Sequence, residues 1–394
     1  MKTLDFNFDF SKRNQADDVI DSLVDRVLAA YPPERIARVK ARSEWTWNSG
    51  LAPANFNDRI SYFVASSGDP DLAKEFQTPE DASDIQGEMI WQLRGMLNNS
   101  VVDCEYYPGF SSGCEQVTIP SMFGCVKEGV SDSDHIRPVI KTPSDVYSLP
   151  PAEIREGFMC HDMLWRMAYK HRRTGGRIPV YMTDVQGPFS CAAQMWGVQD
   201  FLCDLDEHEN EARHLLSLCT DAILNYFHAM RGITDGTMVP IHCFPVIWVP
   251  KDCGVAVSDD FFAVVGGHTV ENFSVPYLDR IGGAFGGVTV HSCGNVNHLP
   301  EVLNKMKTLR SVNFSSSETD LPKYASECDP RITIISHKSG LACKGLPVLN
   351  TVEHIQKCAR TQRITGVKVF STTLWTRVPA DAEHRKAWAE AAKL

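Results

Sequence analysis

Short apolar runs rich in β-forming residues alternate with amphipathic helical segments through most of this chain. The apolar runs lie at residues 178–183, 239–249, 288–291, 311–314, 332–336 and 366–370. Apolar residues recur at helical spacing at 210–230, 269–285, 299–306, 352–363 and 380–392. Strands separated by helices in this way predict an α/β fold with a parallel sheet and right-handed crossovers. About eight such units suit a closed (β/α)8 TIM barrel better than an open sheet.

Residues 1–100 show a different pattern, because helices and loops are predicted there. The stretch 17–30 has apolar residues at helical spacing and stops before Pro32. We therefore expect a helical cap or lid over residues 1–100 and the barrel over residues 101–394. Trp45 and Trp47 are expected to close over the barrel mouth as part of that lid.

Composition excludes several classes of protein. The formal net charge is -10 and no block rich in Lys or Arg occurs, which argues against nucleic acid and anionic membrane surfaces as partners. The 13 cysteines are odd in number and irregularly spaced, so we expect reduced thiols in the cytoplasm rather than a disulfide framework. No run of about 18 apolar residues occurs, and residues 1–10 lack the apolar core of a signal peptide. We therefore expect neither a membrane span nor export.

The sequence His291-Ser292-Cys293-Gly294 follows directly on an apolar run. In a parallel barrel the carboxyl ends of the strands meet at one mouth, so polar residues there are candidates for a site. Side chains two positions apart on an extended segment point the same way, so His291 and Cys293 can reach one metal ion. Both groups bind zinc, and catalytic zinc usually takes three protein ligands. A buried cysteine beside a histidine bonded to the backbone would explain the pair equally well.

The other candidates are polar or aromatic residues near expected strand ends. Asp184 and His337 are candidate acid–base groups, and the candidate substrate-binding residues are Tyr106, His242, Trp248, Asp260 and Trp375. Each has a plainer structural explanation. Asp184 is also suited to a turn, Asp260 to the first turn of a helix capped by Ser258, and the aromatic residues to packing.

Five separated segments resemble the uroporphyrinogen-decarboxylase-like superfamily. They are 183–189 (TDVQGPF), 195–197 (MWG), 248–260 (WVPKDCGVAVSDD), 275–280 (VPYLDR) and 291–294 (HSCG). The resemblance runs from about residue 101 to the C-terminus and implies a TIM barrel. The superfamily contains the decarboxylases of tetrapyrrole synthesis. It also contains zinc methyltransferases that move a methyl group between a corrinoid protein and a thiol.

Two differences in motif separate these branches. The decarboxylases carry an Arg-Gln-Ala-Gly-Arg motif that holds substrate carboxylates. It is absent here, and Arg42 and Arg59 lack its context. The methyltransferases keep His-x-Cys and add a distal cysteine, but Thr376 stands at the corresponding position and is a poorer zinc ligand. His337 or Cys243 is then the third ligand, or the metal is absent.

The resemblance therefore implies a methyltransferase with a metal, zinc, held by His291 and Cys293 at the barrel mouth. Asp206-Glu207-His208 lacks the glycine of a corrinoid-binding motif, so the corrinoid would be carried by a separate partner protein. The alternative enzyme is a decarboxylase or other lyase acting on a carboxylated substrate, with Asp184 or His337 as acid–base group. A third alternative is a binding protein without a metal. The related enzymes also allow a homodimer.

Overall fold

The computed structural model describes residues 4, 6–47, 59–65, 68–113, 115–128, 135–242, 246–338, 345–373 and 380–394. The fold is α/β and is built on a six-stranded sheet of order β1-β8-β7-β6-β5-β4. All neighbouring strands in this sheet are parallel. The strands are β1 (Ser61–Val64), β4 (Val255–Ser258), β5 (Val288–His291), β6 (Leu309–Ser315), β7 (Thr333–Lys338) and β8 (Val369–Thr373).

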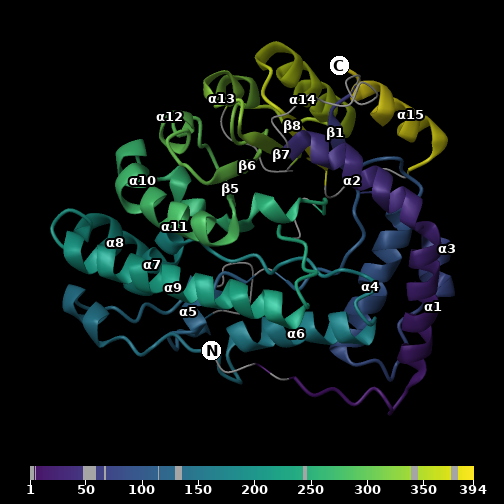
Figure 1. Ribbon diagram of the computed structural model, residues 1–394, viewed down its shortest axis with the longest axis horizontal. Coiled ribbons are helices and arrows are strands. Elements are labelled where there is room, and N and C mark those ends of the chain that lie inside the picture. Colours follow the sequence, from purple (N-terminus) through teal and green to yellow (C-terminus); the bar gives the residue numbers. More distant parts are fainter. Residues whose placement is uncertain are drawn as a thin grey trace.

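Helices surround the strands, as Figure 1 shows. The helices that follow β4 to β8 along the chain are α10 (Gly267–Phe273), α11 (Val275–Phe285), α12 (Pro300–Leu303), α13 (Leu321–Glu327), α14 (Thr351–Thr365) and α15 (Ala382–Ala391). Those of the first half are α1 (Gln15–Ala30), α2 (Pro33–Trp47), α3 (Pro70–Glu75), α4 (Asp84–Asn99), α5 (Thr118–Ser121), α6 (Met159–Arg173), α7 (Pro188–Trp196), α8 (Val198–Asp204) and α9 (Glu209–Ile233). A separate antiparallel pair consists of β2 (Lys127–Glu128) and β3 (His135–Ile136). No helix in the described part of the chain is both long and apolar enough to cross a membrane.

The parallel α/β architecture confirms the coarse prediction from the alternating pattern. The apolar runs at 288–291, 311–314, 332–336 and 366–370 correspond to β5, β6, β7 and β8. The runs at 178–183 and 239–249 form isolated parallel bridges, Phe110 to Val180 and Tyr181 to Val239, instead of named strands. The helix expected at 269–285 is divided at Ser274 into α10 and α11, because Pro276 cannot continue a helix from the preceding turn.

The sheet begins earlier in the chain than the sequence pattern indicated. Strand β1 lies within the region expected to be a helical cap and pairs along its length with β8. Its four residues are all buried, so it has no alternation of apolar and polar side chains. A strand this short and uniform gives little periodic signal. The expected start of the sheet near residue 101 was therefore wrong for this strand.

Two glycines allow β4 and β5 to start side by side. Gly254 has a φ of +91°, and a Cβ placed on it would lie 1.6 Å from the carbonyl oxygen of Gly287. That oxygen accepts a hydrogen bond of 3.2 Å from the backbone N–H of Val255, the first residue of β4. A side chain at position 254 would therefore disrupt the pairing that sets the register of the two strands.

We expect Gly254→Ala to lower the free energy of unfolding by more than about 2 kcal/mol, because it combines backbone strain with a backbone clash. Urea unfolding followed by circular dichroism measures the effect. Gly232→Ala in α9 is the matched control, since a Cβ there meets nothing within 4 Å. The control should change stability by no more than about 1 kcal/mol. Equal stability of the two variants would contradict this account of the β4–β5 start.

Candidate metal site

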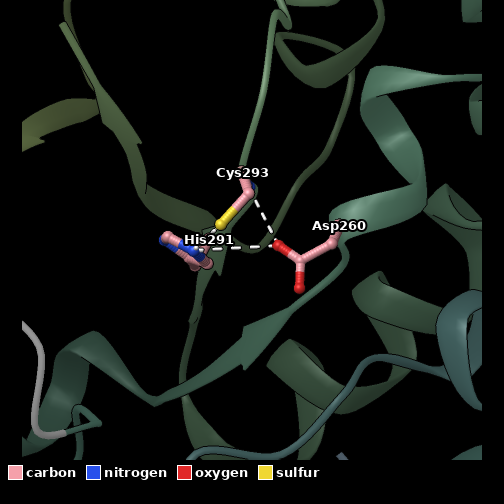
Figure 2. A group of neighbouring side chains, drawn as sticks. All are labelled: Asp260, His291 and Cys293. Carbon is pink, nitrogen blue, oxygen red and sulfur yellow. Dashed lines mark hydrogen bonds and ion pairs between the residues drawn. The ribbon is translucent and has the colours of Figure 1, made fainter. Parts of the chain in front are cut away.

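His291 is the last residue of β5 and lies in a row of side chains across the sheet. The parallel register pairs it with Ser258 of β4 and Asn313 of β6. Asp260 follows β4 by two residues and Cys293 follows β5 by two residues, so both leave the same edge of the sheet as His291. Figure 2 shows the three side chains of Asp260, His291 and Cys293 pointing toward one another.

The three potential ligand atoms all lie within 4.8 Å of one another. Nε2 of His291 is 3.4 Å from Sγ of Cys293 and 3.8 Å from Oδ1 of Asp260. With bond lengths of about 2.0–2.3 Å, tetrahedral zinc holds its ligand atoms roughly 3.3–3.6 Å apart. Nitrogen, sulfur and carboxylate oxygen are all zinc donors. The described residues therefore fit a zinc ion in donor type, and the distance between His291 and Cys293 fits its ligand spacing. The distances to Asp260, 3.8 Å from His291 and at most 4.8 Å from Cys293, are longer than a bound ion would require.

Asn313 fixes which nitrogen of His291 is available. Nδ2 of Asn313 donates a 2.7 Å hydrogen bond to the carbonyl oxygen of Ile335, which can only accept. Oδ1 of Asn313 therefore faces Nδ1 of His291 at 2.6 Å and must accept the proton there. In the neutral form of the imidazole, which carries one N–H, Nε2 then directs its lone pair toward Cys293 and Asp260. This is the arrangement that a metal-binding histidine requires.

The loop that carries Cys293 is held from both sides. The backbone N–H of Cys293 donates a 2.9 Å hydrogen bond to Oδ1 of Asp260. The N–H of Gly294 donates to Oε1 of Glu318 at 3.2 Å, and Thr319 accepts from Val296 and donates to the carbonyl oxygen of Gly294. Gly294 has a φ of +83°, which favours glycine. These contacts position the sulfur before any ion binds.

Burial changes the protonation of the groups around His291. It raises the pKa of the Cys293 thiol well above its ordinary value, and the Asp260 and Glu318 carboxylates raise it further. It lowers the pKa of His242 to about 4 and that of His337 well below its ordinary value. The ring centroids of His242 and His337 lie 5.5 and 5.8 Å from that of His291. At neutral pH the Cys293 thiol therefore keeps its proton, and the imidazoles of His242 and His337 are neutral.

Two buried carboxylates, those of Asp184 and Asp259, lie near the three potential metal ligands. Asp184 accepts a 2.6 Å hydrogen bond from the hydroxyl of Ser258, so this serine is not the helix cap expected for Asp260. Gln186 donates to the second oxygen of Asp260 at 3.3 Å. Asp184 thus contacts the residue of β4 that is in register with His291, and its acid–base role stays a prediction.

Several predicted site residues lie elsewhere. Trp47 donates to the carbonyl oxygen of Trp248 at 3.1 Å, while the neighbouring Thr46 accepts from Thr333 at the start of β7. Trp248 and the Trp45–Trp47 segment therefore lie at the amino ends of the strands, opposite His291, and the expected roles of pocket wall and lid were wrong. Tyr106 packs on Phe63 with ring centroids 5.3 Å apart and is not one of the three potential ligands. Cys243, Trp375 and Thr376 are outside the described residues.

Two residues of the site were missed by sequence reasoning. Asn313 lies within an apolar β-rich run, where its amide was a weak signal of a polar contact inside the sheet. Glu318 follows β6 and is 9% exposed, and its only signal was a carboxylate just after a predicted strand. His337 and Cys243 were the alternatives for a third ligand, beside the absence of a metal, whereas the group of potential metal-binding atoms in the described chain contains Asp260.

A further buried carboxyl, that of Asp259, yields a prediction about pH. One of its oxygens accepts from the N–H and hydroxyl of Ser190 at 3.0 and 2.5 Å. The other finds no hydrogen-bond partner among the described residues and lies against Gly187. Burial raises the pKa of Asp259 to about 7 from an ordinary value of 3.8.

The unfolded chain loses the Asp259 proton near pH 4 and the folded chain near pH 7, so between these values the unfolded state binds fewer protons. The free energy of unfolding should therefore fall as pH rises through this window, by on the order of 4 kcal/mol. In Asp259→Asn, the free energy of unfolding should decrease much less between pH 4 and pH 8, as measured by urea unfolding at both values. The exposed control Asp206→Asn should show the same decrease as wild type. An unchanged slope in Asp259→Asn would refute the assignment.

Comparison with known proteins identifies the fold. No protein-family model matches the chain, and no curated protein matches it by sequence. Among solved structures, it is similar to a methyltransferase from Methanosarcina mazei, with a TM-score of 0.59 and 14% sequence identity. The similarity covers 90% of this chain and 98% of the other. The chain therefore shares the fold of that methyltransferase over nearly its whole length.

Proposed function

We propose that the chain is a methyltransferase with a zinc ion held by Asp260, His291 and Cys293. One observation carries the proposal: an imidazole nitrogen, a thiol sulfur and a carboxylate oxygen converge within 4.8 Å at the carboxyl edge of a parallel sheet. This is the edge at which active sites of such barrels are found. The fold shared with a methyltransferase supports the same class of reaction.

Asp260 supplies the third ligand that the resemblance left open. The zinc methyltransferases of the superfamily use a second cysteine, and Thr376 corresponds to it here. A carboxylate in its place keeps two negative charges among the ligands, enough to neutralise a divalent ion. The assignment does not depend on residue 376.

The protein's own groups prepare the site. Asn313 keeps the proton on Nδ1 of His291 and so leaves Nε2 free to bind. The high pKa of Cys293 means that its thiol must lose a proton when a metal binds. A zinc ion bound here would lower the pKa of a thiol or polarise the heteroatom of a methylated substrate.

The proposed reaction moves a methyl group between a small substrate and a corrinoid carried by a separate protein. In the direction of thiol methylation, the substrate sulfur forms an S–CH3 bond while the cobalt–carbon bond breaks. Both bonding electrons remain on cobalt, which leaves as cob(I), and the thiol proton goes to solvent. The reverse direction takes the methyl group from a methoxy or methylthio substrate. We further propose that this chain acts as a homodimer, as the related enzymes allow.

The proposal includes a closed (β/α)8 barrel of the uroporphyrinogen-decarboxylase-like superfamily, with residues 1–100 partly covering it. Isolated parallel bridges support closure, since they join Phe110 to Val180, Tyr181 to Val239 and Gln186 to Ser258. The last of these attaches to β4, at one edge of the six-stranded sheet. At the other edge, the N–H of Glu105 donates to the carbonyl oxygen of Tyr62 in β1.

A lyase is less well supported. An acid–base group works best when its pKa is near the operating pH. Burial lowers the pKa of His337 well below its ordinary value, so this imidazole is poorly suited to donate a proton at neutral pH. Asp184 is engaged with Ser258.

The test uses zinc-loaded protein with free methylcobalamin as methyl donor and 2-mercaptoethanol as acceptor, followed by the absorbance change of the corrinoid. Wild type should demethylate methylcobalamin faster than the reaction without protein. Cys293→Ser should lower the rate at least about 100-fold, because the metal ligand is lost.

Cys203→Ser is the matched control, because Cys203 is also a free cysteine but lies in α8. It should retain the wild-type rate. A wild-type rate no higher than the protein-free rate, or equal rates for the two serine variants, would refute the proposed function.

A further inference from the structure

A cavity of about 690 Å³ lies at the β1 edge of the sheet, separate from the metal ligands. Its walls are β1 with Phe63, one face of α4, and the segment from Tyr106 to Ser111. Its volume is within the range of roughly 300–1,000 Å³ that small-molecule sites occupy. None of Asp260, His291 and Cys293 lines it. Size and shape therefore allow an organic ligand of moderate size.

Gly95 gives the first independent indication of a ligand. It lies inside α4, where glycine costs about 1 kcal/mol relative to alanine. A Cβ built on it meets nothing within 4 Å, and its φ does not call for glycine. Neither packing nor backbone conformation explains this residue. Its effect is to leave open space on the cavity face of the helix, between Trp91 and Asn99.

The charges in the cavity wall favour an anionic ligand. Glu88 is already paired with Lys170 and Arg166, at 2.7 and 2.9 Å. The carboxylate of Asp69 accepts from the first turn of α3. Arg94 donates one hydrogen bond to the carbonyl oxygen of Phe76, and no carboxylate of the described chain lies within ion-pair distance of it. Its guanidinium has further N–H donors for a carboxylate.

The apolar wall of the cavity lies on the same face of the sheet as the metal ligands. Phe63 is in register with Thr372 of β8, which is in register with His337 of β7. The three side chains therefore point to one face, with Phe63 about 10 Å from His337 at two strand spacings. The His337 ring lies 5.8 Å from that of His291. A ligand in the cavity would thus lie beside the face that carries the site.

We propose that this cavity binds a small organic acid with an aromatic body. The carboxylate pairs with Arg94, and the ring lies over Gly95 against Phe63, Tyr106 and Tyr181. Tyr106 would then contact a ligand, as its sequence position suggested, but in this cavity and not at the metal site. A role for this acid as the methyl-transfer substrate rests on the proposed function. The binding of the acid in this cavity does not rest on it.

The test compares two probes that share a ring system, 2-naphthoate and the uncharged 2-naphthylmethanol, by calorimetric titration of the full-length protein. The acid should bind about tenfold more tightly than the alcohol, because a charge-assisted pair with Arg94 is added. Arg94→Met should remove this preference and leave the alcohol unaffected. Gly95→Leu should weaken both probes at least about tenfold by filling the cavity, and its fold is safe because leucine favours helix.

Gly283→Leu in α11 is the matched control, since its added side chain also meets open space, and it should bind both probes as wild type does. His291→Ala should also leave binding unchanged, which separates this proposal from the metal site. The proposal is overturned if neither probe saturates, if Gly95→Leu binds like Gly283→Leu, or if the acid keeps its preference in Arg94→Met. Loss of binding in His291→Ala would place the ligand at the metal site and overturn it as well.

Discussion

The hydrogen bond between Nδ1 of His291 and Oδ1 of Asn313 is the interaction on which the site depends. It exists because β5 and β6 are parallel and in register at these two residues. The amide of Asn313 is in turn oriented by the carbonyl oxygen of Ile335 in β7. Three strands therefore cooperate to present one imidazole lone pair, and a shift of register by one residue would send Asn313 to the other face.

The surroundings of this lone pair combine groups that are costly to bury. A thiol of raised pKa, two imidazoles of lowered pKa and several carboxylates lie together at the edge of the sheet. A divalent ion would compensate for the negative charge of Asp260 and of the Cys293 thiolate that forms on binding. One carboxylate and one thiolate would together neutralise such an ion. A carboxylate is a harder ligand than a thiolate, so a group with one of each would also tolerate metals that prefer oxygen.

The central strands and the closeness of His291 and Cys293 could be predicted from sequence, but the complete group of potential metal ligands could not. Strands β5 to β8 consist of apolar residues bounded by turns, and this local pattern was sufficient to find them. Strands β1 and β4 were not predicted, although they are four residues long and buried throughout like β5, so length and burial alone do not decide whether a strand is found. Whether Asp260 starts a helix or approaches His291 depends on how β4 aligns with β5. That alignment is a property of the sheet and not of any local segment.

The same reason explains the misplacement of Trp248. Its expected place near a strand end suggested a pocket wall, but the segment contacts the end of α2 beside the amino ends of β7 and β8. Local sequence does not tell which end of a barrel an aromatic residue faces when the segment runs against the strands. The antiparallel bridge between Tyr106 and Ile247 shows that the segment around Ile247 runs opposite to the segment around Tyr106.

X-ray absorption spectroscopy of the zinc-loaded protein tests the central claim most directly, because it counts the sulfur atoms bound to the metal. With Asp260, His291 and Cys293 as ligands, the spectrum should fit one sulfur at about 2.3 Å, with nitrogen and oxygen at about 2.0–2.2 Å. The sulfur component should disappear in Cys293→Ser. A zinc ion without any sulfur neighbour, or one with two, would contradict the ligand group described for this site.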